Sequence, residues 1–119
     1  MTIFEMLVLA HLVGDWIIQT EYEAMNKVKG NFFNLALYKH CFMYTLCFVP
    51  VFLVAGINWW WLLLVFWSHM FLDRRWPVIW WIEKVKRTSP ETINNLFWLV
   101  IAVDQIMHIL ILVIIVILL

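Results

Sequence analysis

Four apolar segments dominate the chain, and each approaches the length that a helix needs to cross a membrane. They cover about residues 3–20, 33–55, 59–73 and 96–119. A bilayer core requires roughly 20 residues, so the third segment is short. Only 13% of the 119 residues are charged and 66% are hydrophobic, whereas a soluble domain keeps roughly a quarter of its residues charged. The sequence therefore predicts a single transmembrane domain over residues 1–119, folded as an all-α integral membrane four-helix bundle.

The connections between these segments carry turn and cap residues. The link 55–58 contains Gly56 and no charge, which predicts a tight hairpin between the second and third helices. Residues 77–87 are typical of a short amphipathic helix that lies along the membrane surface. Ser89, Pro90 and Glu91 form an N-cap, a first helical position and an acidic first turn. We therefore expect the fourth helix to begin two turns before its membrane span.

Every basic residue lies in or beside one of two connections, which follow the first and third segments. These residues are Lys27, Lys29, Lys39, Arg74, Arg75, Lys84, Lys86 and Arg87. With four helices both connections lie on one side, and the positive-inside rule makes that side cytoplasmic. Both termini and the Gly56 hairpin would then lie outside. The tryptophans near the predicted boundaries fit membrane anchoring. The net charge of zero gives no support for nucleic-acid binding.

Histidines and aspartates occur together inside the apolar segments. Each of the three aspartates stands four residues from a histidine, in the pairs His11/Asp15, His69/Asp73 and Asp104/His108. Residues four apart share one face of a helix. The order within the pairs reverses with helix direction, so every aspartate is expected nearer the cytoplasm and every histidine roughly 6 Å deeper. His40 lies early in the second segment, at a similar depth. The pattern predicts one cluster with a cytoplasmic mouth.

Such a cluster needs neutralising partners, because an ionisable group inside a span costs roughly 2.5–3.5 kcal/mol. No lysine or arginine is expected deep enough to neutralise three carboxylates, although Arg74 or Lys39 can reach one. A divalent cation would do so, and imidazole with carboxylate suits zinc, iron or manganese. The candidate ligands are His11, Asp15, His40, His69, Asp73, Asp104 and His108. Alternatively the carboxylates only orient the imidazoles, or the pairs are structural links between helices.

These residues favour a membrane-embedded, metal-dependent hydrolase. A bound metal lowers the pKa of water toward about 7 and polarises phosphoryl or acyl oxygens, and Asp73, expected at the mouth, is the candidate general base. A site at headgroup depth suits an amphiphilic or phosphorylated substrate, lipid-linked ones included. Transport of a metal ion or protons, haem binding and a non-catalytic membrane partner remain alternatives. Transport through four short helices would require a homo-oligomer.

Taken together, the motifs resemble a bacterial and phage membrane-protein family, domain of unknown function 3307. The resemblance rests on His11-Leu-Val-Gly-Asp15-Trp-Ile-Ile-Gln19, Asn26-Lys27, a histidine early in the second segment, Ser68-His69-Met-Phe-Leu-Asp73 and Asp104-Gln105-Ile-Met-His108. It covers nearly the whole chain and implies a small multi-span protein, expected in a bacterial inner membrane, without an established activity. Arg74 and Arg75 stand where the family leads us to expect an apolar residue after the aspartate.

Reporter fusions test the predicted topology. A reporter fused after Arg87 is expected on the cytoplasmic side, and one fused after Asn58 on the outer side, because all basic residues belong to the first side. Paired fusions to a periplasm-active and a cytoplasm-active enzyme measure both positions. A cytoplasmic Asn58 would contradict the topology and the cytoplasmic mouth with it.

Overall fold

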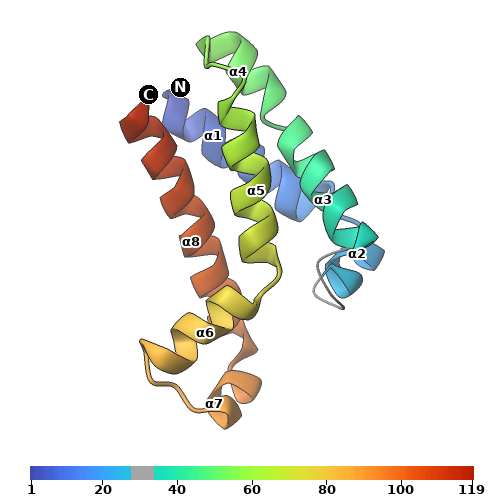
Figure 1. The fold of residues 1–119 in the computed structure, drawn as a ribbon, viewed down its shortest axis with the longest axis vertical. Coiled ribbons are helices and arrows are strands. Elements are labelled where there is room, and N and C mark those ends of the chain that lie inside the picture. The colour runs from blue at the N-terminus through green and yellow to red at the C-terminus, as the bar shows by residue number, and fades with distance from the viewer. Residues whose placement is uncertain (28–33) are drawn as a thin grey trace.

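The computed structural model describes residues 1–27 and 34–119, and every regular element in these ranges is a helix (Figure 1). The all-α prediction is therefore confirmed. Lys29, in the predicted basic connection, and Phe33, at the predicted start of the second span, lie outside the described residues. The elements are α1 (Ile3–Leu12), the π-helix η1 (Val13–Ile17), α2 (Glu21–Asn26), α3 (Leu35–Leu46), α4 (Val49–Ala55), α5 (Trp61–Asp73), α6 (Trp76–Lys84), α7 (Pro90–Asn95) and α8 (Phe97–Leu118).

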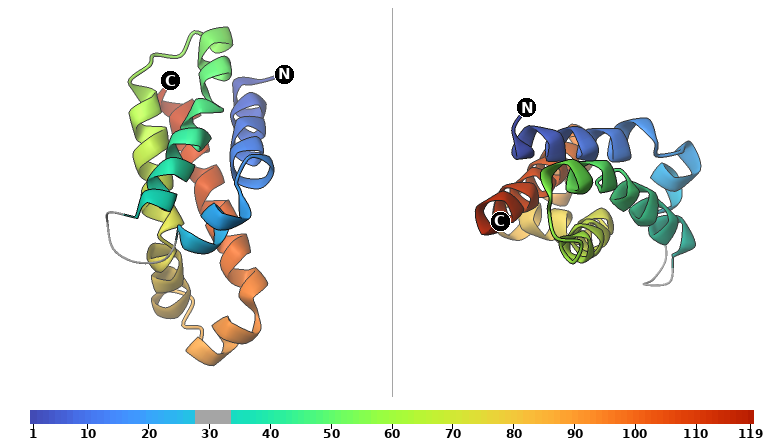
Figure 2. Two further views of the ribbon diagram at one scale, coloured as in Figure 1. Left: turned by 90° about the vertical axis from the view of Figure 1, so that its right-hand side faces the viewer. Right: turned by 90° about the horizontal axis from the view of Figure 1, so that it is seen from above.

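Four helical columns pack side by side around a common axis. α3 packs on α5, α5 on α8, and α8 on α1, while η1 packs on α3 and closes the ring. Both termini and the turn between α4 and α5 lie at one end, and α6 and α7 lie at the other (Figures 1 and 2). α2 lies between the two ends, beside α3. Within the described ranges, Leu35–Ala55 and Phe97–Leu118 are long and apolar enough to cross a membrane, and Trp61–Asp73 is a shorter apolar helix.

Local sequence explains where several helices begin and end. Thr2 and Glu5 form a reciprocal capping box at the start of α1, and Thr20 and Glu23 form another at the start of α2. Gly56, with φ of 66°, ends α4 in the left-handed conformation that glycine adopts at low cost. This turn produces the predicted hairpin between α4 and α5.

Three predicted helices are interrupted. The first segment widens into a π-helix at Val13–Ile17, with a hydrogen bond from the Ile18 N–H to the Val13 carbonyl. The second breaks between α3 and α4, where Pro50 has no N–H to donate to the carbonyl of Leu46. Ser89 caps a helix as predicted, but α7 ends at Asn95. Leu96, with φ −116° and ψ 58°, separates it from α8, so the expected continuous fourth helix is wrong at this point.

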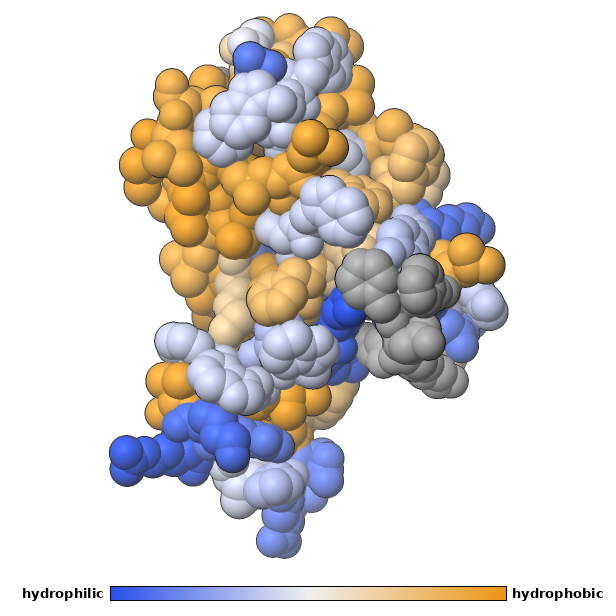
Figure 3. Space-filling view, viewed as in Figure 1, coloured by the Kyte–Doolittle hydropathy of each residue, from blue (hydrophilic) through white to orange (hydrophobic). Residues whose placement is uncertain are grey.

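Among the described residues, buried apolar side chains form a small cluster of Leu37, Cys41 and Met70 and two larger clusters, with polar residues between the larger two. The largest lies toward the termini and includes Leu7, Phe48, Phe52, Trp61, Leu112 and Ile115. The second joins α6, α7 and α8 through Val78, Ile82, Ile93 and Val100. Along α8, Asp104 and His108 fall between these two clusters. Hydrophobic residues cover much of the surface in Figure 3, and hydrophilic ones gather at the α6–α7 end and beside α2.

Candidate metal centre

Four buried side chains from three helical elements direct their donor atoms toward one point. They are Asp15 in η1, His40 in α3, and His69 and Asp73 in α5. The Nε2 atom of His40 lies 2.8 Å from His69 Nε2, 3.1 Å from Asp15 Oδ1 and 3.0 Å from Asp73 Oδ2. The Nε2 atom of His69 lies 3.0 Å from Asp73 Oδ2 and 3.5 Å from Asp15 Oδ1.

These separations match those between the ligands of a tetrahedral metal ion. With bonds of about 2.0 Å, tetrahedral ligand atoms lie roughly 3.3 Å apart, and the five distances run from 2.8 to 3.5 Å. Two neutral imidazole nitrogens that face each other share at most one proton in a single hydrogen bond. A cation at the common point satisfies all four groups at once. Donor type and spacing therefore fit a divalent metal ion.

A second group of donors adjoins the first and shares two of its carboxylates. Asp104 and His108, both in α8, place ligand atoms within 4.8 Å of those of Asp15 and Asp73. The Nε2 atom of His108 lies 3.3 Å from Asp73 Oδ1, which is not the oxygen that faces His40 and His69. The structure thus brings the three aspartates and three of the four histidines into one continuous cluster, as the common spacing predicted.

A buried lysine joins this cluster and corrects the expectation that no basic residue lies deep enough. Lys27 follows α2, and its Nζ atom lies 2.8 Å from Asp73 Oδ2 and 2.6 Å from Gln19 Oε1. Its side chain is only 10% exposed. Lys39, which was expected to reach a carboxylate of the cluster, instead lies 4.0 Å from Glu23 with its side chain mostly in the open. Lys27 reaches the cluster because α2 folds back against α3.

His11, a predicted ligand, lies beside the two donor groups instead of within them. The side-chain amide nitrogen of Gln105 donates to Asp15 Oδ2 at 3.1 Å and to Asp104 Oδ2 at 3.3 Å. Its oxygen therefore accepts, and His11 Nε2 lies 2.8 Å from it. This places the proton of a neutral His11 on Nε2, so Nδ1 accepts from the Tyr44 hydroxyl at 2.8 Å. Both ring nitrogens are engaged, and His11 orients Gln105, which in turn holds two carboxylates.

Tyr44 and Gly14, neither of which was predicted to belong to the site, support the cluster from the side. The Tyr44 ring stacks on that of His69, with centroids 3.6 Å apart and planes 8° apart. A Cβ at position 14 would lie 2.7 Å from Tyr44 Cδ2 and 3.2 Å from Tyr44 Cα, so η1 can approach α3 this closely only with glycine. Tyr44 stands four residues after His40 on the same helix face, and this spacing could have identified it.

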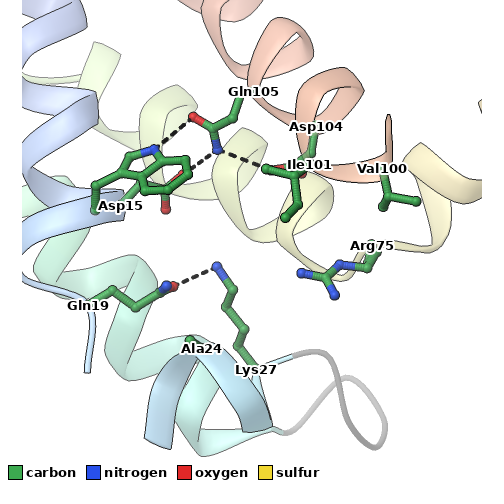
Figure 4. Close-up of a pocket in the computed structure, with 10 residues that line it drawn as sticks. Asp15, Gln19, Ala24, Lys27, Arg75, Val100, Ile101, Asp104 and Gln105 are labelled. Carbon is green, nitrogen blue, oxygen red and sulfur yellow. Dashed lines mark hydrogen bonds between the residues drawn. The ribbon is translucent and has the colours of Figure 1, made fainter. Parts of the chain in front are cut away.

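A cavity of about 190 Å³ opens beside the cluster. Figure 4 shows the side chains of Lys27 and Arg75 directed into it, opposite Asp15, Asp104 and Gln105. Asp73 was expected at the mouth, but it is 3% exposed, and the carboxylates that line the cavity are those of Asp15 and Asp104. Position 73 lies deeper because α5 ends against α8 and Lys27 covers its carboxylate.

Fold and cluster together define an all-helical protein with a buried histidine–aspartate centre. The chain belongs to the family described as protein of unknown function (DUF3307), whose model matches residues 3–119. The resemblance seen in the motifs is thereby confirmed over nearly the whole chain. No curated protein and no solved structure matches the chain. The function must therefore be argued from the site itself.

Substitution of Lys27 tests the corrected charge balance. Lys27→Met removes one partner of a buried ion pair and leaves Asp73 uncompensated, which is expected to lower the free energy of unfolding by about 3–5 kcal/mol. The matched control Lys39→Met removes an exposed lysine and should cost at most about 1 kcal/mol. Thermal unfolding of both variants in detergent measures the difference, and equal melting temperatures would contradict the role given to Lys27.

Proposed function

We propose that this protein is a membrane-embedded, metal-dependent hydrolase whose site opens to the cytoplasmic face. The observation that carries the proposal is the convergence of donor atoms from Asp15, His40, His69 and Asp73 at tetrahedral ligand spacing. Two imidazoles with two carboxylates suit zinc, iron or manganese.

The surface of α8 supports a place in the membrane. Apart from Asp104, Gln105 and His108, which belong to the polar cluster, this helix is apolar on all sides, yet only 22% of its most apolar stretch is buried within the protein. Ile106, Leu110, Ile114 and Ile117 are exposed along one face. A helix that is hydrophobic all round belongs either in a protein core or in lipid, and α8 is too exposed for a core helix. This surface is therefore suited to contact with lipid. The bundle in the membrane would consist of four columns, which are α1, α3 together with α4, α5, and α8.

The distribution of charge supports the orientation. Both termini and the α4–α5 turn lie at one end of the protein, whereas α6 lies toward the other (Figure 1). This helix carries Lys84 and is flanked by Arg74, Arg75, Lys86 and Arg87. By the positive-inside rule the basic end faces the cytoplasm. Lys27 and Arg75 line the cavity, so the cavity belongs to that end. For a bacterial protein, this orientation supports a location in the inner membrane.

Charge balance supports a bound divalent cation. Three carboxylates, those of Asp15, Asp73 and Asp104, face one ammonium group, that of Lys27, in the buried cluster. With neutral imidazoles two negative charges remain, and unpaired buried charge is strongly unfavourable. One divalent cation cancels them. The metal would supply an activated water and would polarise the bond to be cleaved.

The chain's own residues would manage the proton of that water. Asp73 was the candidate base, but Lys27, His40 and His69 surround its Oδ2 atom. Asp15 and Asp104 line the cavity, so a carboxylate on one of them is better placed to accept a proton from water inside it. Gln105 donates to both and keeps them side by side.

The cavity walls support an anionic, amphiphilic substrate. Arg75 and Lys27 place two cations at the cavity, and the apolar side chains of Val100 and Ile101 lie beside them. Arg75 has φ of 69°, a left-handed backbone that costs a non-glycine residue roughly 1–2 kcal/mol. Such strain is often retained at functional positions. A phosphorylated headgroup facing Arg75, with its apolar part toward lipid, matches both properties.

The apolar core favours hydrolysis over transport. Leu7, Phe48, Phe52, Trp61 and Leu112 pack between the cluster and the end that bears the termini. A path for ions or protons requires polar groups or water along its length. This packed apolar layer would interrupt such a path. The arrangement therefore suits a site with one mouth.

Metal removal tests the proposed centre. Detergent-purified protein is expected to contain stoichiometric divalent metal. Chelation should lower its melting temperature, because an ion at 100 times its Kd stabilises the folded state by about 2.7 kcal/mol. Re-adding the ion should restore it. His69→Ala should abolish this response and Glu5→Ala, at an exposed acidic residue, should retain it. Protein without metal that ignores both chelator and added ions would overturn the proposal.

Arginine substitutions test the substrate class. Arg75→Gly should weaken the binding of inorganic phosphate to the metal-loaded protein at least tenfold, because charged hydrogen bonds contribute about 1.5–3 kcal/mol. Arg87→Gly is the matched control, because the backbone of Arg87 is also in the left-handed conformation, with φ of 56°. Arg87 is exposed and follows the C-terminal end of α6. Isothermal titration measures both affinities. Equal affinities in the two variants would exclude Arg75 from anion binding.

A further inference from the structure

We propose that the centre holds a second divalent cation, bridged to the first by Asp73 and bound by His108, Asp104 and Asp15. The inference rests on the proposed function, because the two sites share carboxylates. The first site is closed by protein, whereas the second borders the cavity. The second cation is therefore the one that water and substrate can reach.

The two oxygens of Asp73 face different imidazoles. Oδ2 lies 3.0 Å from the Nε2 atoms of both His40 and His69. Oδ1 lies 3.3 Å from the Nε2 atom of His108, which comes from α8 on the other side of the cluster. A carboxylate with each oxygen aimed at a separate imidazole set has the arrangement of a bridge between two cations.

His108 presents a free lone pair at this second position. Its Nδ1 atom lies 2.7 Å from the backbone carbonyl oxygen of Asp104, so Nδ1 carries the proton and donates. In the neutral ring Nε2 is then an acceptor, and it is buried without a hydrogen-bond partner. An acceptor left unsatisfied in the interior costs about 1–3 kcal/mol. It faces another acceptor, Asp73 Oδ1, and a cation between the two resolves the conflict.

The remaining donors are already held in place. Gln105 donates from one amide nitrogen to Asp15 Oδ2 and Asp104 Oδ2, at 3.1 and 3.3 Å. His11 fixes Gln105 from behind at 2.8 Å, and this gives a reason for a buried histidine outside both donor groups. Asp15 and Asp104 also line the cavity of about 190 Å³. The second cation would thus keep open positions toward the cavity.

Two cations change the charge of the centre. Against the three carboxylates and Lys27, two divalent ions leave an excess of positive charge, which an anionic substrate would compensate. Cation pairs in phosphatases and related enzymes sit roughly 3.5–4 Å apart and bind the attacking and leaving oxygens together. The second site therefore narrows the substrate class to phosphate esters and related phosphoryl compounds.

Zinc stoichiometry tests the second site in the full chain in detergent. After equilibrium dialysis against zinc chloride, the wild-type protein is expected to bind two ions per chain. His108→Ala and Asp104→Asn should each bind one. Glu5→Gln is the control matched to Asp104→Asn, because it neutralises an exposed carboxylate that is not among the donors, and it should bind two.

The spectrum of bound manganese gives a measurement that needs no variant. Two Mn²⁺ ions roughly 4 Å apart should produce a spin-coupled electron paramagnetic resonance signal. One zinc ion per wild-type chain with an uncoupled manganese signal would overturn the second site and leave the proposed function standing. No bound ion would overturn both. Two ions in both His108→Ala and Asp104→Asn would also overturn the assignment of these ligands.

Discussion

Three carboxylates enclosed in an apolar helical protein must be compensated by charge or hydrogen bonds, and this requirement organises the whole interior. Asp73 is its centre, with Lys27, His40, His69 and His108 all within 3.3 Å of its oxygens. These partners come from the end of α2 and from α3, α5 and α8. A single carboxylate thus ties together segments that are far apart in the sequence. Removal of one of these partners would leave the charge of Asp73 unpaired and would destabilise the packing of every helix that contributes a partner.

One of the three helix interruptions, together with a glycine and a helix cap, serves this arrangement directly. The π-helix at Val13–Ile17 carries Asp15 toward His40 and His69, and π-turns of this kind are often found at functional sites. Gly14 lets the same turn approach Tyr44 closely, and Tyr44 contacts both His69 and His11. The capping box at Thr20 fixes the start of α2, and Lys27, which follows this helix, lies against Asp73. The backbone between Val13 and Lys27 therefore brings Asp15 and Lys27 to the polar cluster.

The same arrangement gives the protein two unlike ends. On the side of the termini, apolar residues such as Phe48 and Leu112 fill the interior. On the other side, the cavity between Asp104, Lys27 and Arg75 connects the cluster with its surroundings. α6 packs Val78 and Ile82 against α8 near this end while Trp80 and Trp81 remain exposed. An exposed tryptophan combines an apolar ring with a polar N–H, and such side chains are common at interfaces.

The sequence by itself determined the apolar helical segments, the family and the histidines and aspartates of the cluster. Apolar runs, the Ser89 cap and the Gly56 turn depend on neighbours along the chain, and the four-residue spacing of histidine and aspartate defines a face of a helix. Only the tertiary structure decided what each polar residue does. Lys27 enters the cluster, His11 becomes a support, and Asp73 lies at the centre instead of the mouth. Those roles depend on how helices rotate and fold back on one another, because distances between atoms of different helices are not encoded in any local pattern.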